Sequence, residues 1–220
     1  MTQRTITRRL ACLLVATLCL STAAVAHAQS PEGRWVTEHP AAGGMGSWWD
    51  FHKDGTFVVY EGAMVTSPIA HNADTITLPP STADGPPNHI KFHVDGSTLH
   101  LISPTGADVA YTRVGDAPSA TDALLGKWKP VPPKTFSSDP KTAAIQRSNA
   151  NALYVFGADG TESVRIPFAA RPGTWDAKTQ IFQYRNDRST YNFRFEYGKL
   201  VLGQPPDGKK TETYIPDPLL

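Results

Sequence analysis

Histidine is the residue type in this chain whose placement could support metal binding. Six of the seven histidines lie between His39 and His100. Alternating apolar residues predict a β-hairpin in which His93 lies opposite His100, and two facing imidazoles can coordinate Zn²⁺ or Cu²⁺. No Cys, Asp or Glu completes a ligand set at a suitable spacing, and a similar hairpin later in the chain has Arg194 opposite Val201. We therefore expect an exposed polar strand face, on which His93 and His100 are the candidates for a metal site.

Asp50 and His52 are a second pair with chemical potential. Residues two apart on a strand share a face, so this carboxylate and imidazole can touch. The sequence contains no Gly-x-Ser-x-Gly elbow, His-Glu-x-x-His helix or Ser-x-x-Lys motif, and its other acidic residues show no paired arrangement for glycoside hydrolysis. We expect a surface ion pair, no catalytic residue and no cofactor. A hydrolase with an unrecognised dyad is kept as an alternative.

Aromatic residues are numerous enough to fill a core or to line an apolar pocket. Trp48 and Trp49 are adjacent, and adjacent residues of a strand point to opposite faces, so one of them must leave its own core. That side chain then meets another domain, a ligand, a partner or solvent. We expect Trp48, Trp49, Tyr60 and Trp175 to be the residues that contact a ligand or a partner.

The elements that must position these side chains are predicted to be β-strands almost throughout. The alternating segments 90–94 and 191–195 each precede a Leu-x-Leu strand and predict hairpins with one buried face. In the second hairpin Phe195 lies opposite Leu200, which leaves a two-residue loop. A cap-type residue followed by Pro predicts a short helix over 139–147, with a loop as the alternative because a Ser-Asn-Ala-Asn run follows.

The chain also repeats itself at offsets of between 93 and 105 residues, which is longer than solenoid or propeller repeats. This spacing predicts two copies of one small domain, residues 29–115 and 116–220. The signals that recur in the same order are Gly33-Arg34-Trp35 as Gly126-Lys127-Trp128, Asp54-Gly55-Thr56 as Asp159-Gly160-Thr161, Leu99-His100-Leu101 as Leu200-Val201-Leu202, and Tyr111 as Tyr214.

A Gly-x-Trp motif at the head of each copy, followed by a meander of hairpins, resembles the opening of the lipocalin and calycin superfamily. In that family the Trp closes one end of an up-and-down barrel, and a basic residue near the last strand packs across its ring. The resemblance implies the first role for Gly33, Trp35, Gly126 and Trp128, and the second role for Arg113 in the first copy. We expect an all-β fold of two tandem lipocalin-like antiparallel β-meander barrels with at most one or two short helices. A β-sandwich or one merged barrel is the alternative.

Residues 1–28 have the features of a secretory signal peptide. Three arginines precede an apolar run that is shorter than a membrane-spanning helix, and an Ala-x-Ala site ends at Ala28. Cleavage after Ala28 would leave a mature chain without cysteine or membrane span, which favours a bacterial periplasmic or secreted protein. The full chain has 21 Lys and Arg against 20 Asp and Glu, so loss of three arginines leaves 18 against 20. This balance argues against nucleic acid as the partner.

These features predict an exported, non-enzymatic binding protein of the bacterial cell envelope. We expect its partner to be a small apolar molecule or an envelope or secreted protein, since binding sites tend to differ where duplicated scaffolds agree. The alternative is an inhibitor or immunity protein that neutralises a secreted hydrolase or toxin through exposed loops such as residues 79–88.

Overall fold

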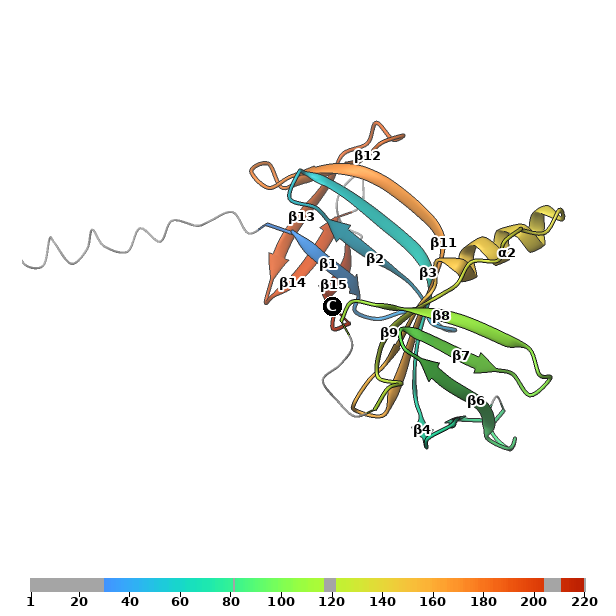
Figure 1. The fold of residues 1–220 in the computed structure, drawn as a ribbon. Coiled ribbons are helices and arrows are strands. Elements are labelled where there is room, and N and C mark those ends of the chain that lie inside the picture. Colours follow the sequence, from blue (N-terminus) through green and yellow to red (C-terminus); the bar gives the residue numbers. More distant parts are fainter. Residues whose placement is uncertain (1–29, 81, 117–121, 204–210, 220) are drawn as a thin grey trace, which may run out of the picture. The chain divides into compact units, whose positions relative to one another are not determined.

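The computed structural model describes residues 30–80, 82–116, 122–203 and 211–219, which form antiparallel strands and one short helix (Figure 1). The predicted all-β class is therefore confirmed. The predicted signal peptide, residues 1–28, lies outside the described residues. In chain order the elements are β1 (Gly33–Thr37), β2 (Met45–Phe51), β3 (Thr56–Pro68), β4 (Ala70–His71), β5 (Thr75–Leu78), β6 (Asn88–Asp95), β7 (Thr98–Ile102), β8 (Asp108–Val114), β9 (Gly126–Pro130), α2 (Pro140–Ala150), β10 (Leu153–Phe156), β11 (Thr161–Asp176), β12 (Ile181–Tyr184), β13 (Tyr191–Glu196), β14 (Lys199–Gly203) and β15 (Thr211–Pro216).

The described strands belong to one continuous antiparallel sheet. Its order is β12-β13-β14-β15-β1-β2-β3-β11-β10-β9-β8-β7-β6-β5-β4, and β12 also pairs with β11. The extra pairing closes what we call the first ring: β1, β2, the first half of β3, the second half of β11, and β12 to β15. Because β4 directly continues β3 and pairs with β5, a second ring forms from the second half of β3 with β4, then β5 to β10, and the first half of β11.

The two repeats exchange strands. The first ring takes β1 to β3 from the first repeat and β11 to β15 from the second (Figure 1). The second ring takes β3 to β8 from the first repeat and β9 to β11 from the second. The offset of 105 residues that relates Gly55 to Gly160 also relates Gly62 to Pro167, and these two residues lie opposite each other in the β3–β11 ladder. The exchange therefore has a local pseudo-twofold centre at this pair. Strands on the two sides of the boundary predicted between residues 115 and 116 are hydrogen-bonded to each other. The sequence did not lead us to expect this pairing between the repeats.

Each ring encloses a hydrophobic cluster that draws on both repeats, as the exchange requires. Burying large apolar side chains on the inward face is what favours these strands over an unfolded chain. The first cluster contains Trp35, Trp49, Phe51, Phe57, Val59, Phe182, Phe193, Leu200, Leu202 and Tyr214. The second contains Ile76, Phe92, Leu99, Tyr111, Leu124, Trp128 and Phe156.

Trp35 and Trp128 occupy equivalent places in the two rings. Each indole Nε1 donates to the carbonyl four residues earlier, at 2.7 Å to Pro31 O and 2.8 Å to Leu124 O. Both are buried, and Trp128 is wholly so. The glycines that precede them by two residues, at positions 33 and 126, have φ angles of 109° and 124°, a region that favours glycine.

Arg113 packs across Trp128, with Cζ 4.0 Å from the ring centroid. The expectation was that Arg113 would cover the Trp of its own repeat, Trp35. The structure differs because β8 pairs with β9, which places Arg113 opposite Trp128, whereas Pro216 lies opposite Trp35 in the first ring. The side chain also donates to the carbonyls of Leu125 and Ala123, and its burial lowers the pKa of the guanidinium.

The hairpin registers predicted from hydrophobic alternation are confirmed. Phe195 lies opposite Leu200 in the β13–β14 hairpin, and His93 lies opposite His100 in the β6–β7 hairpin. The segment Tyr197-Gly198 is the two-residue loop of the first of these hairpins. Short-range pairing therefore follows from local sequence in both repeats.

Candidate functional site

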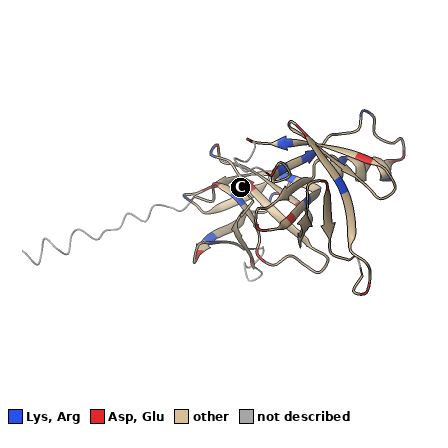
Figure 2. Cartoon of the chain, turned by 60° about the horizontal axis from the view of Figure 1, so that its bottom comes forward, with Lys and Arg blue, Asp and Glu red and all other residues tan. Residues whose placement is uncertain are grey.

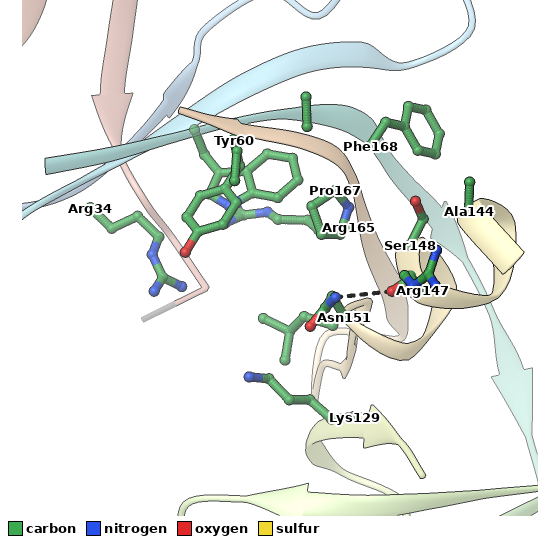
Figure 3. A pocket seen from close by; sticks show the side chains of 14 residues that line it. Arg34, Tyr60, Lys129, Ala144, Arg147, Ser148, Asn151, Arg165, Pro167 and Phe168 are labelled. Carbon is green, nitrogen blue, oxygen red and sulfur yellow. Dashed lines mark hydrogen bonds between the residues drawn. The ribbon is translucent and has the colours of Figure 1, made fainter. Parts of the chain in front are cut away.

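A cavity of about 600 Å³ lies where α2 approaches strands of both rings (Figure 3). Helix α2 has no counterpart in the first repeat, and it contacts β9 and β11. Its N-cap Asp139 accepts a hydrogen bond from Thr142 N at 2.7 Å, so the helix predicted over 139–147 is confirmed. The cavity is lined by Arg34, Trp48, Tyr60, Lys129, Ala144, Arg147, Ser148, Asn151, Leu153, Arg165, Pro167, Phe168, Ala169 and Ala170.

Three aromatic side chains contribute to the apolar part of this lining. Trp48 stacks on Tyr60, with ring centroids 5.6 Å apart and planes inclined by 16°. Phe168 is 56% exposed and projects from the point at which the register of β11 shifts. At this bulge β3 and β11 approach so closely that a Cβ atom on Gly62 would lie 2.0 Å from Ile166 O. Close packing of the two strands therefore fixes the segment that carries Phe168.

Four cationic side chains also line the cavity, and acids neutralise two of them. Arg34 Nη2 donates to Asp50 Oδ2 at 2.8 Å. Arg165 Nη1 and Nη2 both donate to the Asp217 carboxylate, with 2.6 Å between Nη2 and Oδ1. The Arg165 side chain is 6% exposed and that of Asp217 is fully buried. Asp217 follows β15, so this ion pair anchors the C-terminal segment to β11.

Lys129 and Arg147 provide the other two charges, and within the described ranges neither forms an ion pair. Lys129 is exposed because it follows the buried Trp128 on β9 and points to the opposite face. Arg147 lies in the last turn of α2, with Cζ 5.3 Å from the ring centroid of Phe136. Asn151 donates to Arg147 O from both its backbone N and its Nδ2, which closes the helix at this point.

The structure brings two of the four predicted contact residues together. Trp48 and Tyr60 line the cavity, whereas Trp49 belongs to the core of the first ring and Trp175 packs against that core. Trp48 and Trp49 point to opposite faces of β2, as predicted, but both are buried. Trp48 leaves the core to contact Tyr60, and Arg165 Cζ lies 6.0 Å from its ring. Trp49 also borders a separate cavity of about 330 Å³ in the first ring.

Sequence reasoning missed Arg34, Lys129, Arg147, Arg165 and Phe168 as lining residues. Charged residues on strands and helices are typical of solvated faces, and Phe168 was one of many aromatic residues that could fill a core or line an apolar pocket. The sequence signal that could have pointed to these lining residues was the helix that is predicted in the second repeat alone. An insertion that covers the outer face of a sheet can complete a concave site on it.

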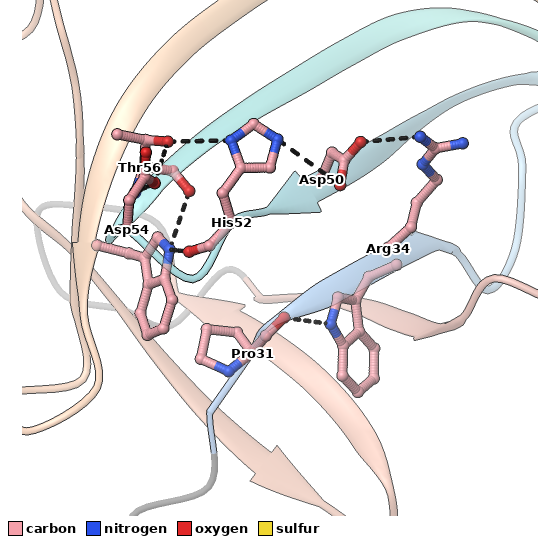
Figure 4. A network of polar contacts seen from close by, with 8 residues as sticks. Pro31, Arg34, Asp50, His52, Asp54 and Thr56 are labelled. Atoms are coloured by element: carbon pink, nitrogen blue, oxygen red, sulfur yellow. Dashed lines mark hydrogen bonds and ion pairs between the residues drawn. The ribbon is translucent and has the colours of Figure 1, made fainter. Parts of the chain in front are cut away.

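Asp50 and His52 belong to a polar network at the β2–β3 turn (Figure 4). His52 Nε2 lies 3.8 Å from Asp50 Oδ1, which is the predicted contact, and His52 Nδ1 lies 3.0 Å from Thr56 Oγ1. Thr56 Oγ1, however, donates to Asp54 Oδ1 at 2.6 Å, and the hydrogen bonds from Thr56 lower the pKa of Asp54. Because the Thr56 hydroxyl donates to Asp54, its oxygen is placed to accept a hydrogen bond from His52 Nδ1. Asp50, His52 and Thr56 therefore have the order of a triad, but the hydroxyl is hydrogen-bonded to a carboxylate.

His93 and His100 stack in parallel, with ring centroids 4.4 Å apart and planes inclined by 3°. His100 Nδ1 lies 3.1 Å from both carboxylate oxygens of Asp108. In the part of the chain that the structure describes, no three or more His, Cys, Asp or Glu side chains are grouped so that they could hold a metal ion.

No helix in the described ranges combines the length and the hydropathy needed to cross a bilayer. Comparison of the chain with protein-family models, with curated proteins and with solved structures finds no match. The lipocalin-like relationship therefore stays a prediction that rests on the Gly-x-Trp motifs and the order of strands.

Proposed function

We propose that this chain is an exported, non-enzymatic binding protein of the bacterial cell envelope, and that the cavity beside α2 holds a small molecule with an apolar body. The observation that carries this proposal is the cavity itself. Its volume of about 600 Å³ lies within the range of small-molecule sites. Its lining combines the aromatic rings of Trp48, Tyr60 and Phe168 with polar and cationic side chains, and small-molecule sites pair apolar walls with polar groups that fix the orientation of the ligand.

One further observation supports a binding role. The Asp50, His52 and Thr56 arrangement, which has the order of a catalytic triad, has its hydroxyl hydrogen-bonded to Asp54. Export is inferred from residues 1–28 alone, and N-terminal sequencing of the mature protein should begin at Gln29. A mature protein that begins at Met1 in an envelope fraction would contradict this part of the proposal.

Binding can be measured with N-phenyl-1-naphthylamine, a neutral probe whose fluorescence rises in apolar surroundings. We expect saturable binding by the wild-type protein. The Tyr60→Ala and Phe168→Ala variants should each bind about tenfold more weakly, because a lost aromatic contact of about 1.5 kcal/mol corresponds to that factor. Tyr197→Ala is the matched control, since Tyr197 is fully exposed in the β13–β14 turn. Failure of the wild type to bind, or equal binding by all four proteins, would overturn the assignment of the cavity.

Native mass spectrometry of protein purified from its own periplasm tests the kind of partner. A co-purifying small molecule that is lost from Phe168→Ala supports the proposal. A co-purifying polypeptide with no small molecule would contradict it and favour an inhibitor or immunity protein.

A further inference from the structure

The cavity beside α2 has an unbalanced positive charge. Its described lining contains four cationic side chains and no Asp or Glu. Two of these cations are matched by acids in the ion pairs given above, but Lys129 and Arg147 are not. The whole chain is close to neutral, with 21 basic and 20 acidic residues, and Figure 2 shows charges of both signs spread over the described strands, so the excess is local to this site. A concave surface with two unmatched cations attracts an anion.

The unmatched cations lie in a different part of the lining from the rings of Tyr60 and Phe168. Figure 3 shows Lys129, Arg147 and Asn151 on the lower side of the cavity, with Tyr60 and Phe168 on the upper side. A ligand that fills this space therefore meets charge at one end and aromatic surface at the other.

Arg147 is held in a state that suits anion binding. The ring of Phe136 faces its guanidinium, with Cζ 5.3 Å from the ring centroid, so one flat face of the cation is engaged by the aromatic ring. The N–H groups lie in the guanidinium plane and point along its edges, where they can donate in pairs to a planar or tetrahedral anion. Lys129 adds a compact charge from β9 on a flexible stem.

We propose that the ligand of this cavity is an amphipathic organic anion. Its aromatic or acyl body packs against Tyr60 and Phe168, and its carboxylate, sulfonate or phosphate group lies between Lys129 and Arg147. This inference rests on the proposed function, because it assigns a chemical class to the small molecule that the cavity holds. A neutral ligand would leave both cations without a partner, and an inorganic anion would leave the aromatic surface uncovered.

Two probes with the same aromatic skeleton test the charge assignment. N-phenyl-1-naphthylamine is neutral, and 1-anilinonaphthalene-8-sulfonate adds one sulfonate group. We expect Lys129→Gln and Arg147→Gln each to weaken binding of the anionic probe about tenfold, the factor that corresponds to one charge-assisted hydrogen bond, and to leave the neutral probe unchanged. Lys91→Gln is the matched control, since Lys91 is an exposed cation on β6 outside the cavity lining. Each variant is first shown to unfold cooperatively in urea.

Competition separates an amphipathic ligand from a simple anion. Dodecanoate should displace the anionic probe from the wild-type protein, and inorganic phosphate at the same concentration should not. Raising the salt concentration should weaken binding of the anionic probe more than binding of the neutral probe, because salt screens the partly exposed cations. Equal displacement by phosphate would overturn the amphipathic part of the inference.

The outcomes distinguish the inference from the proposed function on which it rests. If both probes bind equally well and the charge substitutions change nothing, the anion assignment is overturned and the cavity stays a site for a neutral molecule. If neither probe binds, the proposed function fails together with the inference. Selective loss of the anionic probe in Lys129→Gln and Arg147→Gln supports both.

Discussion

Removing the Asp217 carboxylate is expected to lower the free energy of unfolding by about 3–5 kcal/mol, because it leaves the Arg165 guanidinium buried without a counter-charge. The Arg165 side chain is 6% exposed and the Asp217 side chain is fully buried. Both terminal nitrogens of Arg165 donate to this carboxylate, and Asp217 Oδ1 also accepts from Leu219 N at 2.9 Å. Asp217→Ala therefore leaves several donors without an acceptor at once, beside an arginine side chain that is only 6% exposed.

The expected magnitude arises from burial, so an exposed pair in the same molecule is the proper comparison. Arg171 and Glu61 form such a pair, with side chains 54% and 47% exposed. We expect Glu61→Ala to cost at most about 1 kcal/mol, the usual upper value for surface ion pairs. The double variant Arg165→Met with Asp217→Leu removes both buried charges together and should lie within about 1 kcal/mol of the wild type.

Urea unfolding followed by tryptophan fluorescence and far-UV circular dichroism measures all four proteins by linear extrapolation. Coincident transitions from the two probes would justify a two-state treatment. The reasoning is refuted if Asp217→Ala costs less than about 1 kcal/mol, or if the double variant is as unstable as the single one.

Three further sets of substitutions test other parts of the fold. Trp35→Ala and Trp128→Ala should each lower the free energy of unfolding by about 3–5 kcal/mol, the cost of emptying a large aromatic site, and a loss below about 1 kcal/mol at both would show that the Gly-x-Trp motif is not structural. Burial raises the pKa of Glu162 above its usual value of 4.5. The free energy of unfolding therefore falls as the pH rises from 4.5 through the raised pKa of the native state, because the buried side chain must ionise. Glu162→Gln should therefore gain stability relative to the wild type between about pH 4 and pH 7, and an unchanged difference in urea midpoints would contradict this reasoning. Hydrogen bonds from Thr142 lower the pKa of Asp139 below its usual value of 3.8. The Asp139 carboxylate therefore stabilises the native state above pH 3.8, and this stabilisation is lost as the pH falls through the lowered native pKa. At neutral pH, Asp139→Ala should remove the cap of α2 and lower the urea midpoint of unfolding. Asp139→Asn should keep the cap but lose the dependence of stability on acid. Equal midpoints for the wild type and both variants would disprove the capping role.

Local features of the fold could be predicted from the sequence because local interactions determine them. The pairing of Phe195 with Leu200 follows from alternation and loop length, and the helix that begins at Pro140 follows from its cap and first-turn residue. The exchange of strands could not be predicted in this way. Both repeats carry the same strand signals, so local pattern does not distinguish a partner strand in the same repeat from its equivalent in the other repeat.

The candidate site was predicted only in part for the same physical reason. Trp48 stands out because an adjacent Trp pair forces one ring away from the core. Lys129 and Arg147 do not stand out, since an exposed cation on a strand or helix is the ordinary way to solvate a surface. They line the same cavity because α2 contacts β9 and β11, and that packing depends on strands distant in sequence.

The strand exchange also has a consequence for how the chain folds. Trp35 near the N-terminus pairs with Pro216 near the C-terminus, so the first ring cannot close until its last strand has been synthesised. Contacts of such large sequence separation slow folding, because loop-closure entropy must be overcome before they form. Two separate copies of a single repeat would need to collide before they exchanged strands in this way. Covalent linkage replaces that collision with a high effective concentration of one repeat around the other, so closure of both rings is expected to be independent of protein concentration.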